Sequence, residues 1–485
     1  MSRSVRASAA ALALVLPLAL AGPVLPAVGT AGAAATSGTG AAPGDERAVS
    51  RPVEDSYYPA KGDPTVDALH YDLDLTWLRK ARTLRGVATI DLRVARDDVV
   101  LKLDLSRRLD VTSVHLDGEQ AAFRHEGNHL VVPALVDEGE RRTVRVTYRG
   151  TPGPAAGPAS RPDIARLGMR VTLDGWLWTM QEPFGAFTWY PVNDHPSDKA
   201  LYTVRVSAPG RWVGVSNGTL ASRRTRDGRT VTRWTNRDPM PAYLLTLAVG
   251  PYRAFRQTGP RGLPITHWVP RDEPELVRPL LSTPAAVRWL EKRLGRYPFE
   301  SAGVVLTPGD SAMETQTMVT FGTDNFGLGA RHVRSTVVHE LAHHWWGNAV
   351  TPSQWRDLWM NEGMATYLQA RWDAEHGGPA EAFRWTLAEW TASDQWYRDL
   401  YGPPGRFERG EFGSVNVYYS AALMWEHLRR QLGSATFHRL TRRWPQSRLH
   451  TNSDRDALVR WWSEQAGRDL EPFFDRWLDS RRSPA

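Results

Sequence analysis

The residues with the most recognisable chemistry lie together in the run His339-Glu340-Leu341-Ala342-His343. Two histidines four residues apart on a helix point the same way, so both rings can reach one metal ion about 2 Å away. Glu340 then lies beside that ion, where its carboxylate can take a proton from a metal-activated water. The flanking apolar residues suit one face of such a helix; they are Val333, Val337, Leu341 and Trp345. The spacing therefore predicts a hydrolytic zinc site with His339 and His343 as ligands.

A third ligand is expected from a second helix, which contains Leu358 to Tyr367 and includes Glu362. Gly347 and Pro352 end the first helix, and the segment up to Glu362 leaves room for a loop and an antiparallel return. Three protein ligands leave the fourth zinc position for water, as a catalytic site requires. His344 points about 100° away around the helix, so we expect it to pack in the core, as we expect of Trp345 and Trp346.

Composition restricts the other classes of protein. The chain of 485 residues has 41% hydrophobic and 23% charged residues, which is typical of a globular protein with two or three domains. It contains no cysteine, which excludes disulfides and cysteine-based zinc sites. The net charge is +7, but the arginines are scattered, and the densest run, Arg223 to Arg233, contains Asp227-Gly228 and is typical of an exposed hairpin. We therefore expect no nucleic-acid partner.

The N-terminus is typical of a cleaved signal peptide. Arg3 and Arg6 precede an apolar stretch from Ala9 to Ala21, and small residues follow at Ala31 to Ala34. Pro17 and Pro23 interrupt the apolar run, which is short for a membrane span, so we expect no stable membrane insertion. Residues 1–35 are predicted to be removed near Ala33 to Ala35, and the mature protein is predicted to be secreted. Residues 36–55 are rich in Gly, Ala, Ser and Pro and are predicted to be a flexible segment.

Two kinds of periodicity divide the remaining chain. Short runs with period-two alternation predict a β-sandwich-like domain over residues 56–252, interrupted by a surface loop at Pro152 to Pro162. The expected strands include Tyr71 to Leu75, Ala88 to Val94, Val99 to Leu105, Val144 to Tyr148 and Leu244 to Val249. Helical patterns follow, so residues 253–485 are predicted to form a mainly α domain. The expected helices are Leu276 to Leu294, Ser335 to Trp346, Met360 to Trp372, Ala380 to Ala392, Ala421 to Leu432 and Asp456 to Trp477.

With these motifs the sequence resembles the aminopeptidase N family of zinc metallopeptidases, in its short secreted bacterial form, from about Asp67 to Trp477. The family's metal motif is matched by His339 to His343 and by Asn361-Glu362-Gly363. The resemblance implies one Zn²⁺ per chain and an α+β multidomain fold: an N-terminal antiparallel β-sandwich-like domain and a mainly α, thermolysin-like catalytic domain that also holds a small sheet. It also implies that the large helical C-terminal domain of longer members is absent here.

The resemblance also implies which residues bind the substrate. Ser311-Ala312-Met313-Glu314-Thr315 is similar to the family's Gly-Ala-Met-Glu-Asn motif, although both ends differ. In the family this glutamate, here Glu314, binds the free α-amino group, and Ala312 and Met313 lie beside the substrate. Glu182 is the best match to a second contact from the β domain, with Gln181 as the alternative; Glu182 could instead be a structural carboxylate at a domain interface. Two carboxylates at a fixed distance from zinc would anchor an amine and select the first peptide bond.

The family's oxyanion-stabilising tyrosine is implied at Tyr418 rather than Tyr419. Ser420 and Ala421 replace the basic residue and the glycine that usually follow it. A phenol hydroxyl beside zinc can stabilise the negative oxygen of the tetrahedral intermediate.

Together these features predict a monomeric zinc aminopeptidase that hydrolyses the N-terminal residue from peptides with a free N-terminus. A thermolysin-like endopeptidase would share the zinc ligands but lack amine anchors. A noncatalytic peptide-binding protein on the same scaffold would be expected to have lost Glu340 or a ligand, and all of these are present.

Overall fold

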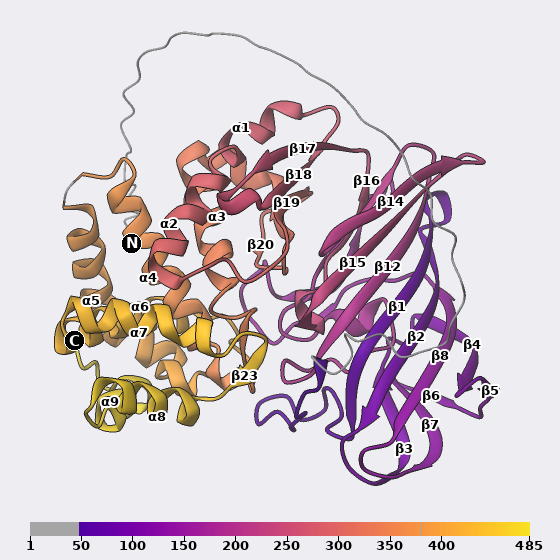
Figure 1. Cartoon of the computed structure of the whole chain (residues 1–485), viewed down its shortest axis with the longest axis horizontal. Coiled ribbons are helices and arrows are strands. Elements are labelled where there is room, and N and C mark those ends of the chain that lie inside the picture. The colour runs from indigo at the N-terminus through magenta and orange to yellow at the C-terminus, as the bar shows by residue number, and fades with distance from the viewer. Residues whose placement is uncertain (1–47, 380) are drawn as a thin grey trace, which may run out of the picture. The chain divides into compact units, whose positions relative to one another are not determined.

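The computed structural model describes residues 48–379 and 381–485 (Figure 1). The expected signal peptide at 1–35 and residues 36–47 of the expected flexible segment lie outside this range. Residues 48–55 are held against the fold rather than free: the main-chain nitrogen of Ser50 donates to Asp67 Oδ1 at 3.0 Å, and Asp55 is fully buried. Among the described residues, no helix has the length and apolarity needed to cross a membrane.

The part before residue 252, called the β part below, is built on an eight-stranded sheet with the order β14-β15-β12-β1-β2-β8-β4-β5. Its strands alternate as expected, and in β1 the side chains of Tyr71, Leu73, Leu75 and Trp77 are buried. The pairing is antiparallel except between β1 and β12, which run parallel. The bounds are β1 (Val66–Leu78), β2 (Thr83–Val94), β4 (Leu109–Leu116), β5 (Glu119–Gln120), β8 (Arg141–Gly150), β12 (Lys199–Pro209), β14 (Thr219–Arg226) and β15 (Arg229–Pro241).

Smaller sheets complete the β part. Trp234 of β15 donates to the Gly214 carbonyl of β13 at 2.9 Å, which packs a five-stranded sheet against the large one. This arrangement confirms the expected sandwich. The five-stranded sheet contains β13 (Val213–Ser216), β16 (Leu247–Gly250), β11 (Leu177–Met180), β10 (Arg166–Val171) and β9 (Ala155–Ala156); a three-stranded sheet contains β3 (Asp98–Asp104), β7 (His129–Val136) and β6 (Arg124–Glu126).

The hairpin expected around Asp227-Gly228 joins β14 to β15. Both residues have positive φ, 49° and 69°, which suits the tight turn of a two-residue hairpin. The arginine-rich run is therefore a hairpin whose first strand, β14, is largely exposed, whereas Thr230 and Thr232 of β15 are buried.

The chain after residue 252, called the helical part below, begins with a second five-stranded sheet of order β17-β18-β19-β21-β20. Periodicity did not reveal these strands, because β19 and β21 are buried throughout and read as continuous apolar runs. They form the small sheet that the resemblance implied. The bounds are β17 (Tyr252–Thr258), β18 (Pro264–Pro270), β19 (Ala302–Thr307), β20 (Ala312–Met313) and β21 (Val319–Gly322).

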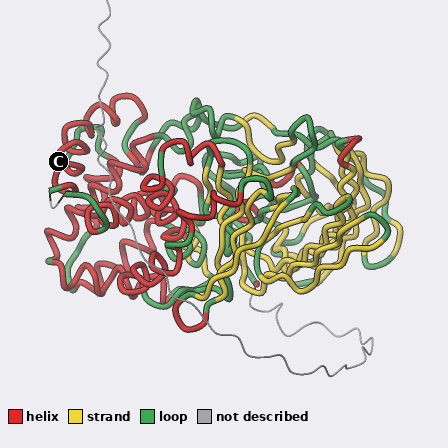
Figure 2. The backbone as a smooth tube through the Cα atoms, turned by 90° about the horizontal axis from the view of Figure 1, so that it is seen from above, coloured by secondary structure: helices red, strands yellow, loops and turns green. Residues whose placement is uncertain are grey.

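Helices make up most of the rest, and Figure 2 shows their separation from the strands. The expected helix at Asp456 to Trp477 is two helices, because Gly467 adopts a left-handed conformation that ends α8. Helix α7 was not expected from the sequence. The bounds are α1 (Val277–Leu280), α2 (Thr283–Leu294), α3 (Ala330–His343), α4 (Trp359–Glu375), α5 (Ala382–Tyr401), α6 (Val415–Leu432), α7 (Ser434–Ser447), α8 (Arg455–Ala466) and α9 (Glu471–Asp479), with a short pair β22 (Val350–Pro352) and β23 (Thr451–Ser453).

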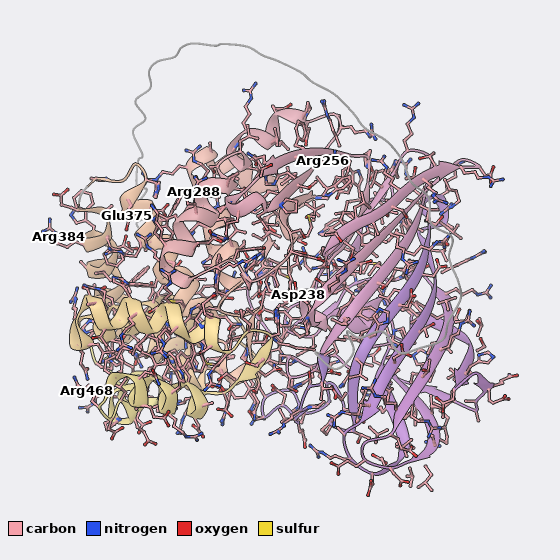
Figure 3. All side chains as sticks on the ribbon, viewed as in Figure 1. Asp238, Arg256, Arg288, Glu375, Arg384 and Arg468 are labelled. Atoms are coloured by element: carbon pink, nitrogen blue, oxygen red, sulfur yellow. The ribbon has the colours of Figure 1, made fainter. Side chains whose placement is uncertain are left out.

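The β part and the helical part meet along buried polar contacts. Figure 3 marks Asp238, at the end of β15, between the strands and the helices, whereas Arg384 and Arg468 lie on the periphery of the helical part. The Asp238 carbonyl accepts from Gln316 Nε2 at 3.2 Å. Close by, Asn217 Nδ2 donates to the Gln316 carbonyl at 2.6 Å. These bonds fix the segment that carries Glu314 against the β part.

Candidate active site

Two antiparallel helices bring the expected metal ligands together. His339 and His343 lie on the last turns of α3, and Glu362 lies on the first turn of α4. His339 Nε2 lies 3.2 Å from Glu362 Oε2 and 3.1 Å from His343 Nε2, and His343 Nε2 lies 3.4 Å from Glu362 Oε2. All three side chains are buried. Donor atoms of a tetrahedral zinc site, with bonds of about 2.0–2.1 Å, lie about 3.3 Å apart, so these residues fit one Zn²⁺.

The second nitrogen of each imidazole fixes the ring. His339 Nδ1 lies 3.1 Å from Gln369 Oε1, and His343 Nδ1 lies 3.2 Å from the Trp346 carbonyl. Both partners are acceptors, so each Nδ1 can keep its proton while each Nε2 gives up its own to bind metal. Gln369 in turn donates to Ser335 Oγ at 3.1 Å, and Ser335 donates to Asp373 Oδ2 at 2.7 Å. The sequence motif did not identify Gln369, although its position seven residues after Glu362 places it on the same helix face.

Among the three metal ligands, Glu362 supplies the negative charge. Burial opposes its ionisation, but the charge of His343 and hydrogen bonds from both imidazoles hold the pKa of Glu362 below its usual value. Burial lowers the pKa of His343, but the charge of Glu362 and the hydrogen bond between the two side chains raise it to about 10. The ligands therefore form a strongly interacting group even without a cation.

Glu340 lies beside the ligands in the same cavity, as the helix spacing predicted. Burial raises the pKa of Glu340 well above its usual value, His343 lowers it, and the carboxylates of Glu314 and Glu362 raise it further. A bound divalent cation favours the ionised form, so metal at the ligands would oppose this shift.

Glu314 and Glu182 come from different parts of the chain and line the same cavity. Glu314 follows the edge strand β20, and Glu182 follows β11. Both side chains have one buried carboxylate oxygen with no hydrogen-bond partner among residues 48–379 and 381–485. Burial raises the pKa of each; Glu314 raises that of Glu182 further. A buried carboxylate oxygen without a partner is costly, and each of these two side chains has one, which points to a positively charged ligand group between them.

Gln181, the alternative to Glu182, has a different role. Its side chain donates to the carbonyls of Ala242 and Leu245, at 2.8 and 2.5 Å, and accepts from Trp189 Nε1 at 2.9 Å. The amide is fully buried in the β part. Because these three bonds occupy both ends of the amide, Gln181 supports the fold, and Glu182 is the acidic candidate. Ala312 and Met313 line the cavity as expected.

Tyr418 lies over the metal ligands, as expected. Its ring stacks with that of His339 at a centroid distance of 6.1 Å. Tyr419 also borders the cavity but packs against Trp390 and Tyr397 of α5. Of these two tyrosines, Tyr418 is therefore the one whose ring packs against a metal ligand.

Arg161 joins the site from the loop at Pro152 to Pro162, which was expected to lie on the surface. Its guanidinium carbon lies 5.3 Å from the centroid of the Tyr418 ring. It is held there by Asp163, at 2.7 Å, and by the Gly413 carbonyl, at 2.6 Å. Burial raises the pKa of Tyr418 well above its usual value, Glu362 raises it further, and Arg161 lowers it. Arg161 thus places a positive charge beside Tyr418, although Ser420 stands where the family usually has a basic residue.

The expected core residues of α3 are buried. His344 Nδ1 donates to Tyr297 Oη at 2.7 Å, and burial lowers the pKa of His344 to about 3. Trp345 and Trp346 are buried in the helical part, where Trp346 packs against Trp425 with ring centroids 5.4 Å apart. These three residues support the helix and do not face the metal ligands.

The cavity that unites the groups has a volume of about 270 Å³. The Peptidase family M1 domain matches residues 282–477, and the Peptidase M1 N-terminal domain matches residues 67–244. The chain belongs to peptidase family M1. In this M1 chain the two matched regions correspond to the helical part and the β part, in the same order.

Individual relatives agree with this membership. Aminopeptidase N of Streptomyces lividans is 25% identical over 447 residues, covering 86% of this M1 chain and 50% of the relative. Glutamyl aminopeptidase of Homo sapiens is 28% identical over 343 residues, covering 63% of this chain and 34% of the relative. The chain thus spans half or less of these relatives. A solved structure matches it over nearly its whole length: a variant of the Deinococcus radiodurans M1 zinc metallopeptidase bound to a Tyr-Ser-Ala substrate has 27% identity and a TM-score of 0.79, covering 90% of this chain and 99% of that one.

Proposed function

We propose that this M1 chain is a zinc-dependent aminopeptidase that hydrolyses the N-terminal residue from short peptides. The observation that carries the proposal is the meeting, in one cavity, of a zinc-fitting triad and two carboxylates, Glu314 and Glu182, each with a buried oxygen that has no hydrogen-bond partner among the described residues. The tripeptide held by the Deinococcus relative supports peptides as the substrate class.

The chemistry divides between the metal and the chain. Zn²⁺ held by the three ligands would supply Lewis acidity that lowers the pKa of water and polarises the scissile carbonyl. Glu340 takes the proton from the attacking water and later donates it to the leaving amine. The buried position of Glu340 keeps this proton away from bulk solvent.

Substrate orientation comes from Glu314 and Glu182. A protonated α-amino group between them would balance the charge of the two carboxylates and form charge-assisted hydrogen bonds. Because both carboxylates lie at fixed positions relative to the ligands, the bound amine places the first peptide bond at the metal. A peptide with a blocked N-terminus would leave both carboxylates unpaired and would bind poorly.

Tyr418 donates its hydroxyl to the carbonyl oxygen as negative charge develops on it. The guanidinium of Arg161 favours this donor role because a nearby positive charge stabilises electron density on the phenol oxygen.

The proposal is tested with paired peptides that have either a free or an acetylated N-terminus, with and without a chelator. Chelator-sensitive cleavage of only the free peptide supports a zinc aminopeptidase. Equal cleavage of both would indicate an endopeptidase, and cleavage of neither would indicate a noncatalytic binding protein. The variant Glu314→Ala should lose the preference for the free peptide, whereas Glu389→Ala, an exposed change on α5, should not.

We also propose that the protein is exported as a monomer. The support is the N-terminal sequence, with its basic start, apolar stretch and small residues up to Ala34. N-terminal sequencing of protein from the culture medium should give a first residue near Ala33 to Ala35. Recovery of the protein only inside cells, with Met1 or Ser2 at its start, would contradict export. Light scattering should give the mass of one chain.

A further inference from the structure

The cavity has two ends, and contacts along α3 distinguish them. Glu314 belongs to the end of the cavity at the C-terminus of α3: Asn348 Nδ2 donates to the Glu314 carbonyl at 2.8 Å, and the Asn348 main-chain nitrogen donates to the His343 carbonyl at 2.9 Å. His332 and Thr336 line the cavity on the preceding turns of the same helix, away from that terminus. A peptide whose amine lies at Glu314 therefore continues past the metal ligands toward Thr336 and His332.

Helix α4 runs antiparallel to α3, and its contacts give the same order of residues along the cavity, starting from Glu314. Glu362 contacts His343 and His339, whereas Gln369 contacts His339 and Ser335, further from Glu314. Thr366 lies between Glu362 and Gln369 on this face and lines the cavity. The residue after the scissile bond therefore meets Thr336 from one helix and Thr366 from the other.

Thr366 has an unsatisfied hydroxyl. Its side chain is 4% exposed, and Oγ1 has no hydrogen-bond partner among the described residues. A helical threonine commonly satisfies this group by donating to the carbonyl four residues earlier. Thr386 and Thr441 do so in this structure, at 3.1 and 2.8 Å. Thr366 keeps its hydroxyl unpaired in the cavity instead, at a cost that a bound polar group would remove.

The polar groups that neighbour Thr366 in the cavity already have partners, except for the hydroxyl of Thr336. Both ends of the Gln369 amide are used by His339 and Ser335. His332 Nε2 donates to Asn325 Oδ1 at 3.2 Å. Thr336 Oγ1 has only a long contact to His332, at 3.5 Å. The available groups are thus two neutral hydroxyls on facing helices.

We propose that Thr366 and Thr336 select a substrate whose second residue carries a hydroxyl or an amide side chain. This specificity rests on the proposed aminopeptidase function, because it takes the residue after the scissile bond as the ligand. A hydroxyl or amide can both donate to and accept from the two threonines. An aliphatic side chain of the same shape leaves the buried Thr366 hydroxyl unpaired. Neither threonine carries a charge, so these two side chains give a charged side chain no salt bridge.

The test compares Ala-Thr-Ala with Ala-Val-Ala, because threonine and valine have nearly the same shape. The zinc-loaded wild-type enzyme should have a kcat/KM about tenfold higher for Ala-Thr-Ala, as expected for one or two hydrogen bonds to a buried group. Equal values, or a preference for valine, would overturn the proposal.

The variant Thr366→Val locates the specificity. It keeps the shape of the side chain and removes the hydroxyl, so the ratio of the two kcat/KM values should fall to about one. The matched control is Thr386→Val, on α5 and outside the cavity, which should keep the wild-type ratio. Zinc content and the melting temperature show that each variant is folded and loaded. A Thr366→Val enzyme that keeps the wild-type ratio would contradict the assignment to Thr366.

Failure of this inference is distinct from failure of the proposed function. If neither tripeptide is hydrolysed from its N-terminus, the aminopeptidase function itself is wrong. If both are hydrolysed at the same rate, the enzyme is an aminopeptidase and only the second-residue specificity is wrong.

Discussion

The metal ligands are held by residues that form a chain of hydrogen bonds behind them. His339 bonds to Gln369, Gln369 to Ser335, and Ser335 to Asp373, so the chain crosses between α3 and α4 three times. Such outer partners fix the tautomer and the direction of the ligand nitrogen. The ring of His339 is thereby oriented before a metal arrives.

Replacing Gln369 with leucine should weaken zinc binding about 10- to 100-fold, because Nδ1 of His339 loses its acceptor. Competition with a chelator of known affinity at fixed pH measures the change. Gln395→Leu, an exposed glutamine on α5, is the control and should bind zinc like wild type. Unchanged affinity in Gln369→Leu would show that the ring is held by packing alone.

Glu340→Gln should lower kcat by a factor of about 10² to 10⁴, the usual contribution of a positioned general base, and should leave the zinc content at one per chain. The amide fills the same space but cannot take the proton from water. Activity assays with metal analysis on the same sample check both points. A variant that keeps wild-type kcat would assign the proton transfer to another group.

At the scale of elements, the site depends on the small sheet as well as on the two helices. Edge strand β20 leads directly into Glu314, and two strands, β19 and β21, separate β20 from β18 in the same sheet. His267 of β18 is fully buried, and its Nε2 lies 2.9 Å from Gln257 Oε1 of β17. Burial lowers the pKa of His267 to about 4.

This burial makes the sheet sensitive to acid. Between pH 6.5 and 4 the unfolded chain binds a proton at His267 that the folded chain does not, so acidification favours unfolding. From pH 7 to 4.5 this imidazole should cost the wild type about 2 kcal/mol of unfolding free energy. Denaturant titrations of wild type and His267→Gln at both pH values measure this effect: the loss of unfolding free energy between pH 7 and 4.5 should be larger in the wild type. Parallel losses in the two proteins would show that His267 does not carry it.

At the scale of the whole described molecule, the N-terminal segment and buried polar side chains join the β part to the helical part. Asp55 Oδ2 accepts from the main-chain nitrogen of Trp355 at 2.8 Å and lies 3.5 Å from His195 Nε2. Lys199 of β12 donates Nζ to the carbonyls of Asn348 and Ala349, at 3.0 and 3.3 Å, just beyond the ligand-bearing helix. The placement of Glu182 relative to the metal ligands depends on such contacts.

Asp55→Ala should lower the free energy of unfolding by about 3 kcal/mol, because it leaves three main-chain donors, one of them buried, without their acceptor. These donors are the nitrogens of Tyr57, Tyr58 and Trp355. Asp110→Ala, an exposed change on β4, is the control and should alter stability by less than about 0.5 kcal/mol. Urea titration measures both; equal stability of the two variants would mean that the segment does not hold the two parts together.

The sequence by itself determined what depends on short-range geometry. Helical spacing placed His339, Glu340 and His343 on one face, and the motif around Glu362 supplied the third ligand, because residues three or four apart on a helix are neighbours in any fold. Alternation predicted β1, β2 and β8 of the large sheet for the same local reason, whereas β4, β5 and β12 were not predicted. Resemblance to a family pointed to Glu314, Glu182 and Tyr418, whose positions the structure brings into one cavity.

Only the tertiary structure decided what depends on distant segments. Hydrophobic periodicity cannot distinguish a buried parallel strand from a helix, so β19 and β21 were not predicted from the sequence. The full pairing of the Gln181 amide, the contact of Arg161 with Tyr418 and the unpaired hydroxyl of Thr366 each depend on side chains from separate elements. No local pattern records such contacts, because they form only when the β part and the helices pack together.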